Sequence, residues 1–420
     1  ATTAGGLDLS GFYSQKYGKV GLTVFGSRNT GSPYDPADIG LTAIPKFERY
    51  TINPRLFIYG ENTTANVGFS YVTEDRLGGS MDYIKRGTSG YFEQNNTDRF
   101  TTQLGIAHRL TDRATLSFKN SYSRFDRQIL IPSYQFQGLQ QSSFSELTLG
   151  TQGEKSEWIV GANFLTDEFK EEQQQTNPLR NYQYNIYGVF VQNQWSPSNF
   201  LTLETGLRGD YVSEYGFELL PRVSAMLRFT PKLTTRIGGG FGYKTPTVFN
   251  EESERVQFQN ILPINVAAVQ NERSVGSNVD VNYRTNFGDL GFTINQLFFY
   301  TRLNEPLVLT NSGAVSEFVN ANGYIDTKGG ETNLRLTYGD FKLFVGYTYA
   351  DVNSHFVGRK EWFPLTARHR LNNVLMYEKD EKLKIGLEAY YFSPQRLNDG
   401  ATGKSYWIMG LMGEKVWEKV

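Results

Sequence analysis

The chain has 420 residues, and its 42 Lys and Arg against 43 Asp and Glu give a formal net charge of −1 at pH 7. This balance gives no reason to expect nucleic acid or a polybasic membrane contact. The absence of cysteine excludes a disulfide framework and a thiolate metal site, and no stretch reaches the roughly 18 apolar residues of a membrane-spanning helix.

Amphipathic segments of about a dozen residues follow one another along the whole chain, with no linker between them. We therefore treat residues 1–420 as one domain. Alternation of apolar and polar residues with a period of two predicts β-strands, and the fold class is all-β. The predicted strands, about 19 in number, span residues 7–14, 18–27, 47–59, 64–73, 98–110, 114–127, 141–152, 157–168, 182–195, 200–213, 219–229, 233–243, 273–287, 290–303, 317–338, 340–352, 366–377, 383–393 and 405–413.

The two faces of each segment differ in a way that indicates a membrane wall. In 200–213, Leu203 and Leu207 alternate with Glu204 and Arg208. In an outer-membrane β-barrel the aliphatic face points to lipid and the charged face to the lumen. A soluble sandwich also alternates, but its strands average only about five or six residues. The charged residues predicted to face the lumen are Arg208, Asp210, Arg222, Arg228, Arg236, Glu331 and Arg335.

The connections between segments are by turns very short and long. Short turns at one end and long loops at the other are typical of a transmembrane antiparallel β-barrel, with the long loops outside the cell. Pro54 lies within a predicted strand and cannot donate a ladder hydrogen bond, which predicts a β-bulge. The predicted long loops are 28–46, 74–97, 128–140, 169–181 and 244–271.

Six short segments follow in order through the second half of the chain: 206–211 (GLRGDY), 221–224 (PRVS), 240–247 (GFGYKTPT), 329–333 (GGETN), 346–351 (GYTYAD) and 364–371 (PLTARHRL). Taken together they resemble strand motifs of the TonB-dependent outer-membrane transporters. The chain departs from those motifs at 243–245 and at Ala367, where the family often has proline. The first and last segments resemble sequences of Bacteroidetes-type envelopes.

The resemblance implies a barrel of about 22 strands around an N-terminal plug. In that frame 1–4 is the tail of strand 1, 405–413 is strand 20, and the plug and the last two strands are missing. The implied function is an outer-membrane receptor of a Gram-negative bacterium that imports a scarce large solute, with energy from the TonB complex acting through the plug. Ferric siderophore is the first expectation for the solute, followed by cobalamin or haem. The lumen charges then either dock the plug or form salt bridges within the wall.

Ligand capture is expected at the extracellular loops, because aromatic and basic side chains suit large anionic chelates. The alternative is that the loop aromatics pack the loops against one another. The predicted ligand-binding residues are Tyr34, Asp35, Tyr83, Arg86, Tyr91, Phe92, Tyr134, Phe136, Phe249, Glu251, Arg255, Phe258 and Trp362.

Nothing in the sequence indicates an enzyme, a resident cofactor or a metal site. The three histidines, His108, His355 and His369, do not have zinc-ligand spacing. The run Gly238–Gly240 is not followed by a predicted helix, so it does not read as a phosphate loop. Two other classes stay open: a passive diffusion porin, although porins have about 16–18 strands, and a soluble adhesin or propeller.

Overall fold

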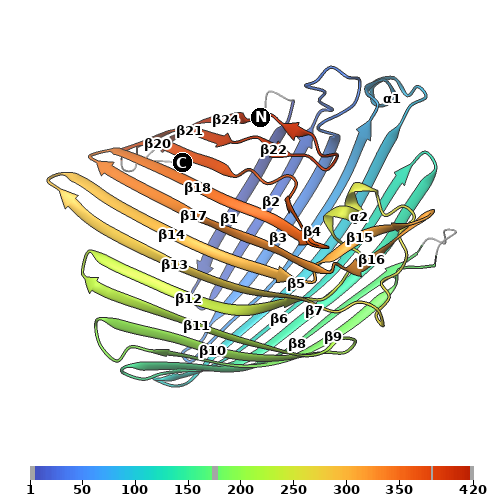
Figure 1. Cartoon of the computed structure of the whole chain (residues 1–420). Helices are drawn as coiled ribbons and strands as arrows, with labels where there is room; N and C mark the ends of the chain where they lie inside the picture. The colour runs from blue at the N-terminus through green and yellow to red at the C-terminus, as the bar shows by residue number, and fades with distance from the viewer. Residues whose placement is uncertain (1–4, 173–177, 380–381, 417–420) are drawn as a thin grey trace.

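The computed structural model describes residues 5–172, 178–379 and 382–416. Long antiparallel strands form a single meander that curls into a barrel wall (Figure 1). The long strands are β1 (Leu7–Tyr17), β2 (Val20–Gly31), β3 (Lys46–Tyr59), β4 (Thr63–Gly79), β5 (Phe92–Thr111), β6 (Ala114–Ile131), β7 (Tyr134–Gln152), β8 (Ser156–Glu171), β9 (Tyr182–Trp195), β10 (Leu201–Val212), β11 (Gly216–Thr230), β12 (Leu233–Lys244), β13 (Glu272–Phe287), β14 (Leu290–Asn304), β17 (Gly323–Tyr338), β18 (Phe341–Phe356), β20 (His369–Lys379), β21 (Leu383–Phe392) and β24 (Tyr406–Lys415).

Short strands and two short helices accompany the long strands of this wall. Strand β19 (Arg359–Trp362) pairs with the end of β18 and completes a 20-stranded sheet. Two separate hairpins, β15–β16 (Leu307–Ser312, Val315–Asn320) and β22–β23 (Gln395–Arg396, Thr402–Gly403), lie in the connections, with the helices α1 (Met81–Arg86) and α2 (Glu251–Arg255). In the described part of the chain, no helix is long and apolar enough to cross a membrane.

The predicted antiparallel all-β fold is confirmed, and each predicted strand corresponds to one long strand of the wall. Each pairs with its neighbours in sequence, as an up-and-down barrel requires. Among the described residues, β1 pairs only with β2, and β24 only with β21. The predicted segment 317–338, whose glycines at 323, 329 and 330 indicate either a kink or two strands, is two strands: 317–320 belong to β16, and β17 begins at Gly323. The predicted strand-1 tail at 1–4 lies outside the described residues.

The two ends of the barrel differ as predicted, but two loops are shorter than expected. Strands β6 and β7 continue to a tight turn at Pro132–Ser133, so 128–140 is a hairpin. Strands β4 and β5 extend to Gly79 and Phe92, which leaves only 80–91 as a loop. Both hairpins project beyond the lipid-facing band. Their outward faces carry polar residues such as Asp75, Gln128 and Gln137, so the outward apolar residues that mark a membrane strand are absent there.

The bulge predicted at Pro54 is wrong. The β3–β4 ladder pairs Ile52 with Tyr71 and Arg55 with Gly68, and the register is the same on both sides of the gap. On the other side, Pro54 pairs with Val24 in an unbroken β2–β3 ladder. The missing N–H therefore interrupts one ladder locally without inserting a residue.

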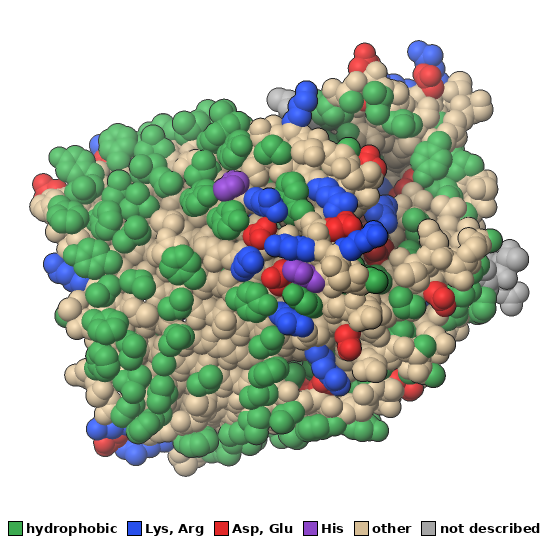
Figure 2. All heavy atoms as spheres, viewed as in Figure 1, with side chains coloured by type: hydrophobic (Ala, Val, Ile, Leu, Met, Phe, Trp, Pro, Cys, Tyr) green, Lys and Arg blue, Asp and Glu red, His purple; other side chains and the backbone are tan. Residues whose placement is uncertain are grey.

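The wall has no hydrophobic core of its own, because its apolar side chains point outward. Val189 is 65% exposed and Leu219 is 55% exposed, whereas Asp210, on the opposite face of β10, is buried. Figure 2 shows hydrophobic side chains spread over one part of the outer surface, with charged side chains gathered toward the end that carries the loops. This distribution is typical of a lipid-facing surface.

Candidate ligand-binding vestibule

A buried apolar cluster lies at the loop end of the barrel, where α2 and its flanking loop 245–271 fold across the opening (Figure 1). The cluster joins side chains from three wall strands, the loop and the β15–β16 hairpin. We call this assembly the vestibule cluster. Its buried members are Ile129, Phe136, Phe169, Val248, Phe258, Ile261 and Phe318.

Aromatic stacking holds the loop to the wall. The rings of Phe136 and Phe258 are stacked with centroids 4.4 Å apart, and Phe249 meets Phe169 edge-on at 4.8 Å. Both geometries are favoured by the quadrupoles of the rings. Phe258 adopts a positive φ of 61°, which is uncommon for a residue with a Cβ. The packing therefore offsets a strained backbone at this point of the loop.

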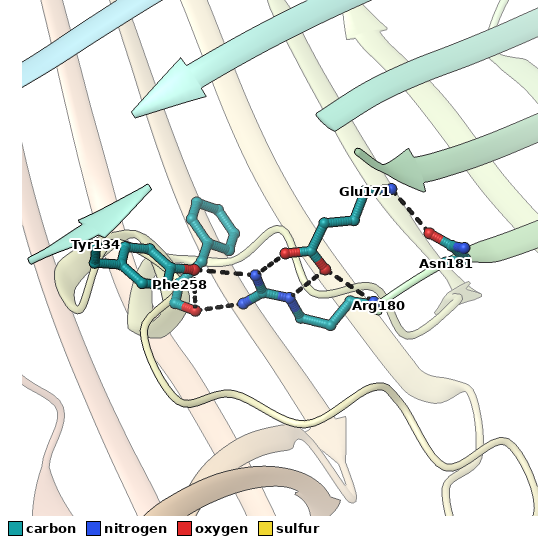
Figure 3. Close-up of polar contacts among 5 residues, drawn as sticks. All are labelled: Tyr134, Glu171, Arg180, Asn181 and Phe258. Atoms are coloured by element: carbon teal, nitrogen blue, oxygen red, sulfur yellow. Dashed lines mark hydrogen bonds and ion pairs between the residues drawn. The ribbon is translucent and has the colours of Figure 1, made fainter. Parts of the chain in front are cut away.

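A buried ion pair lies directly beside these rings (Figure 3). Arg180 and Glu171 have side chains only 4% and 2% exposed. The Arg180 Nε and backbone N–H both donate to Glu171 Oε2 at 2.9 Å, and the Glu171 N–H donates to Asn181 Oδ1 at 2.8 Å. Burial opposes the positive charge, but hydrogen bonds with Glu171 and Tyr134 outweigh it and raise the pKa of Arg180.

The same guanidinium holds the loop in place through its backbone. Arg180 Nη1 donates to the carbonyl oxygen of Phe258, which also accepts a hydrogen bond from the Tyr134 hydroxyl at 2.9 Å (Figure 3). Arg180 Nη2 donates to that hydroxyl at 3.1 Å. A carbonyl in a tight loop would otherwise be left without a partner, at a cost of roughly 1–3 kcal/mol. The ion pair is thus a fixed anchor for the loop.

More exposed polar contacts fix the position of α2. Arg127 on β6 donates to both carboxylate oxygens of Glu254, at 2.6 and 2.8 Å. The carboxylate of Glu252 accepts the backbone N–H of Leu309 at 2.6 Å. Burial raises the pKa of Glu252, and this hydrogen bond opposes the effect. Asn250 caps the helix by accepting the N–H of Ser253 at 3.0 Å.

Several cavities open beside the docked loop. One of them, which we call the α2 pocket, has a volume of about 510 Å³ and lies between α2, β15, the end of β18 and β19. This volume lies within the roughly 300–1,000 Å³ range of small-molecule sites. Apolar and charged side chains share its lining, among them Glu251, Arg255, Leu307, Ile325, Trp362 and Arg396.

A smaller cavity, which we call the Tyr91 pocket, has a volume of about 360 Å³ and lies between β4, β5 and the docked loop. Arg76, Glu93 and Gln257 line it together with Tyr91. Gln257 Nε2 donates to the Tyr91 hydroxyl at 3.1 Å and to Glu93 at 2.9 Å, so the loop forms one wall of this cavity too.

The structure separates the predicted ligand-binding residues into groups. Glu251, Arg255 and Trp362 come together in the α2 pocket, whereas Tyr91 lines the Tyr91 pocket. Phe136 and Phe258 are fully buried and Phe249 packs against them, so direct contact with a ligand is corrected to a role in the core of the vestibule cluster. The alternative of aromatic packing between loops therefore holds for these rings.

Of the remaining predicted residues, Tyr134 belongs to the vestibule through its hydrogen bonds with Phe258 and Arg180. The others lie in outer loops or strands and are not brought into a shared site. Tyr83 stacks on Phe92 at 4.6 Å, and Arg86 lies 3.5 Å from Asp82 within α1. The Asp35 carboxylate accepts the N–H groups of Ile39 and Gly40 and so organises its own loop. Tyr34 is exposed and pairs through its backbone with Ile44, while Tyr134 and Phe92 lie in strands and not in loops.

The predicted lumen residues share one face of the wall. Arg208 pairs with Leu220, Arg222 with Gly240 and Arg335 with Thr293 in the ladders. All of these residues alternate along their strands with the exposed aliphatic residues, so they lie on the inward face. Arg208 binds Asp210 at 2.9 Å, and the Tyr243 hydroxyl donates to Asp210 at 3.0 Å. Arg222 lies 3.8 Å from Glu204, Arg228 donates to Thr202 at 3.0 Å, and Glu331 accepts from Asn333 at 2.6 Å. Arg236 lies on the same face, opposite Asp280.

Sequence reasoning missed the residues that build the vestibule. Arg180 and Glu171 lie at the ends of a predicted loop whose middle, 173–177, is outside the described residues. The signal available was an arginine and an acid in a segment rich in polar residues, which gives no hint of burial. Arg127 lies one residue before the predicted 128–140 loop, and only the hairpin geometry brings it to α2. In the described ranges no group of three or more His, Asp or Glu side chains could hold a metal ion.

Comparison with known proteins identifies the class of barrel. The family model for the TonB dependent receptor-like β-barrel matches residues 10–416. The chain therefore belongs to this family of outer-membrane receptor barrels. No curated protein matches it by sequence.

Solved structures of the same fold include three iron-related receptors. The siderophore receptor PirA from Acinetobacter baumannii aligns with a TM-score of 0.76 at 14% identity, over 99% of this chain and 71% of that one. The FrpB iron transporter from Neisseria meningitidis aligns with a TM-score of 0.77 at 14% identity, over 98% and 72%. The ferric-catecholate import receptor Fiu from Escherichia coli gives 0.72 at 12% identity, over 97% and 73%. Likeness at this identity establishes the fold.

Proposed function

We propose that this chain is the barrel of an outer-membrane receptor that binds a scarce large solute at the vestibule and imports it with energy from TonB. The α2 pocket carries the proposal, because it lies beside the docked loop and combines apolar walls with charges of both signs. Membership of the receptor family and the outward-facing apolar wall support placement in the outer membrane of a Gram-negative bacterium. We expect no enzymatic activity and no resident cofactor.

The solute we favour is a ferric siderophore, with cobalamin or haem next. Siderophore and iron receptors among the solved structures of this fold support the first choice. Arg255 and Arg396 could meet an anionic chelate, and Trp362 and Leu307 could cover its apolar parts.

Coupling to TonB requires a plug, and we propose that one is supplied by sequence outside residues 1–420. The alignments support this, since this chain covers only 71–73% of the three receptors described above. The inward-facing Arg222, Arg236 and Arg335 would contact the plug, because wide barrel lumens are filled by such domains.

Growth tests on the full-length receptor can decide the function. A strain that lacks the receptor is supplied with a ferric siderophore, cobalamin or haem as its single source, with and without TonB. We expect growth on a ferric siderophore that needs both proteins. Uptake that continues without TonB would indicate a passive porin, and unchanged growth of the deletion strain on every source would overturn the substrate assignment.

A matched pair of variants locates the binding site. Arg255→Gln removes a cation from the α2 pocket, whereas Arg86→Gln removes one from the exposed helix α1, outside both pockets. Loss of one charge-assisted contact, at about 1.5–3 kcal/mol, should weaken siderophore binding about 10- to 100-fold in the first variant only. Equal effects in both would exclude the α2 pocket as the site.

A further inference from the structure

The outer surface carries a band of cations just beyond the apolar wall on the β14–β20 side. On β14, Phe298, Tyr300 and Arg302 follow one another on the outward face, and the first two are exposed. Register pairs Tyr300 with Lys328 and Arg302 with Asp326, so Lys328 and Arg302 face outward together. Cross-strand partners share a face of the sheet.

The band continues across the next strands. On β18, the outward residues Tyr347 and Tyr349 precede Asp351 and His355 toward the loop end. His355 pairs with Lys360 on β19, which brings that lysine to the same face. We call Arg302, Lys328, Lys360 and Arg368 the basic band, and Arg368 joins it through an ion pair with Asp351 at 3.1 Å.

Acidic groups within the band are covered, whereas its lysines are not. Asp326 is 7% exposed and accepts from His355 at 2.9 Å, and Asp351 is 9% exposed beneath Arg368. Lys328 and Lys360 are exposed, and neither forms an ion pair with any residue that the structure describes. The basic side chains seen near the centre of Figure 2 border the hydrophobic surface. The band therefore presents net positive charge to its surroundings.

Ring stacking fixes part of this surface before any ligand arrives. The Arg302 guanidinium lies 3.8 Å from the centre of the Tyr324 ring, and the His355 ring stacks on the same Tyr324 ring with centroids 4.3 Å apart. An arginine held over an aromatic ring keeps its outer N–H groups free for an anion. The array loses less conformational entropy on binding than free side chains would.

The height of the band decides which anion it meets. Tyrosines at the end of the apolar stretch mark the membrane interface in barrels, and here Tyr300, Tyr347 and Tyr349 take that position. The band lies level with and just beyond them, toward the loop end, where headgroups of the outer leaflet lie. Below it, Leu334, Leu343 and Val345 offer an apolar strip for acyl chains.

We propose that the basic band binds the phosphate groups of a phosphorylated glycolipid of the outer leaflet. The inference rests on the proposed placement of the barrel in the outer membrane, but it does not depend on which solute is imported. Arginine and lysine suit phosphate through charge-assisted hydrogen bonds. The acyl chains of the same molecule would lie along the apolar strip.

The opposite side of the barrel carries more acids at the same height. There Tyr71 and Phe100 end the apolar stretch, and Asp75, Asp98 and Asp126 follow on the outward faces of β4, β5 and β6. Asp98 and Asp126 are direct cross-strand partners, and Arg124 forms an ion pair with Asp126 at 3.3 Å. The carboxylates on this side offset its cations, so a phosphorylated headgroup is attracted less strongly there, and we expect the glycolipid on the side of the basic band.

The test uses the full-length receptor extracted in detergent and native mass spectrometry with diphosphorylated lipid A as the probe. Lys328→Gln/Lys360→Gln removes two band cations, and the matched control Lys46→Gln/Arg124→Gln removes two cations from the β3–β6 side. Each cation near an anionic lipid surface contributes about a factor of five, so the band variant should bind about 30-fold more weakly. The control variant should bind as the wild type does.

Three further measurements keep the result decisive. Dephosphorylated lipid A should bind the wild-type receptor as weakly as lipid A binds the band variant, and inorganic pyrophosphate should compete poorly. Strong competition by pyrophosphate, or equal losses in both double variants, would overturn the proposal. Unchanged siderophore uptake by the band variant would show that it folds, and it separates failure of this inference from failure of the proposed transport function.

Discussion

The vestibule and the membrane wall use apolar residues in opposite ways. In the vestibule, Phe136 and Phe258 are fully buried and a paired arginine and glutamate lie among them, as in the core of a water-soluble protein. In the wall, Leu207 and Val189 are exposed because their solvent is lipid. One chain therefore holds two folding environments, and a rule for burial learned in one fails in the other.

The largest effect is expected from breaking the buried ion pair. Arg180→Ala would leave the Glu171 carboxylate uncompensated and remove one of the two hydrogen bonds to the Phe258 carbonyl. Removal of one partner of a buried pair costs about 3–5 kcal/mol, and we expect the upper end of that range. Amide exchange in 245–271 of the full-length receptor should rise to that of an undocked loop. The double variant Arg180→Met/Glu171→Met should cost much less, and equal losses would rule out the uncompensated charge as the cause.

Phe258→Ala should destabilise the docked loop by about 3–5 kcal/mol, because truncation of a buried aromatic residue leaves a cavity. The ring stacks on Phe136 and meets Phe249 at 5.7 Å. Limited proteolysis should then cut within 245–271 while the barrel stays intact. Phe298→Ala, on the exposed face of the wall, serves as the matched control and should leave the loop protected. Cleavage of both variants at the same rate would contradict the distinction between the two regions.

Leu207→Lys tests the wall directly. In water, a lysine at a position 48% exposed would be nearly neutral. In a bilayer, the same change should cost about 2–4 kcal/mol, since Leu207 lies midway between Leu203 and the girdle residue Tyr211. Urea unfolding of the receptor in lipid vesicles measures the difference, with Leu207→Ile as control. A neutral result would mean that this face does not contact lipid.

Arg127→Gln should have a modest effect on docking of α2, about 1 kcal/mol, because the pair with Glu254 is partly exposed. Arg86→Gln breaks a fully exposed pair on α1 and should cost close to nothing. Amide exchange in 251–255 compared with 81–86 separates the two. A larger loss from Arg86 would reverse the expected order.

The smallest effect is a pH dependence of loop docking from Glu252. Burial raises the pKa of this carboxyl in the folded loop. The folded loop therefore binds a proton more tightly than an undocked one, so docking is strongest below the ordinary glutamate pKa of about 4.3 and weakens as pH rises through the raised value. Amide exchange corrected for its intrinsic pH dependence should show this trend, and Glu252→Gln should flatten it. A trend of opposite sign would exclude Glu252 as its source.

Strand prediction succeeded in the lipid-facing part of the barrel and failed where strands extend beyond it at the loop end. The apolar alternation of 200–213 or 233–243 marks a membrane strand to within a few residues. The upper parts of β6 and β7 are strands as well, but Gln128 and Gln137 lie on their outward face, and their apolar Ile129 and Phe136 face the vestibule instead of lipid. Pro54 misled in the other direction, because a ladder can omit one hydrogen bond without changing register.

The sequence by itself determined the fold and the two faces of the wall, because strand period and residue polarity are local properties. Apolar residues of the alternation face lipid and polar residues face the lumen. It also led to the receptor family, through motifs such as 206–211. Only the tertiary structure decided which loop aromatics are core and which line a cavity. Phe258 meets Arg180 and Phe136 across 78 and 122 positions of chain, and contacts so distant in sequence arise only when the curled wall brings its loops together.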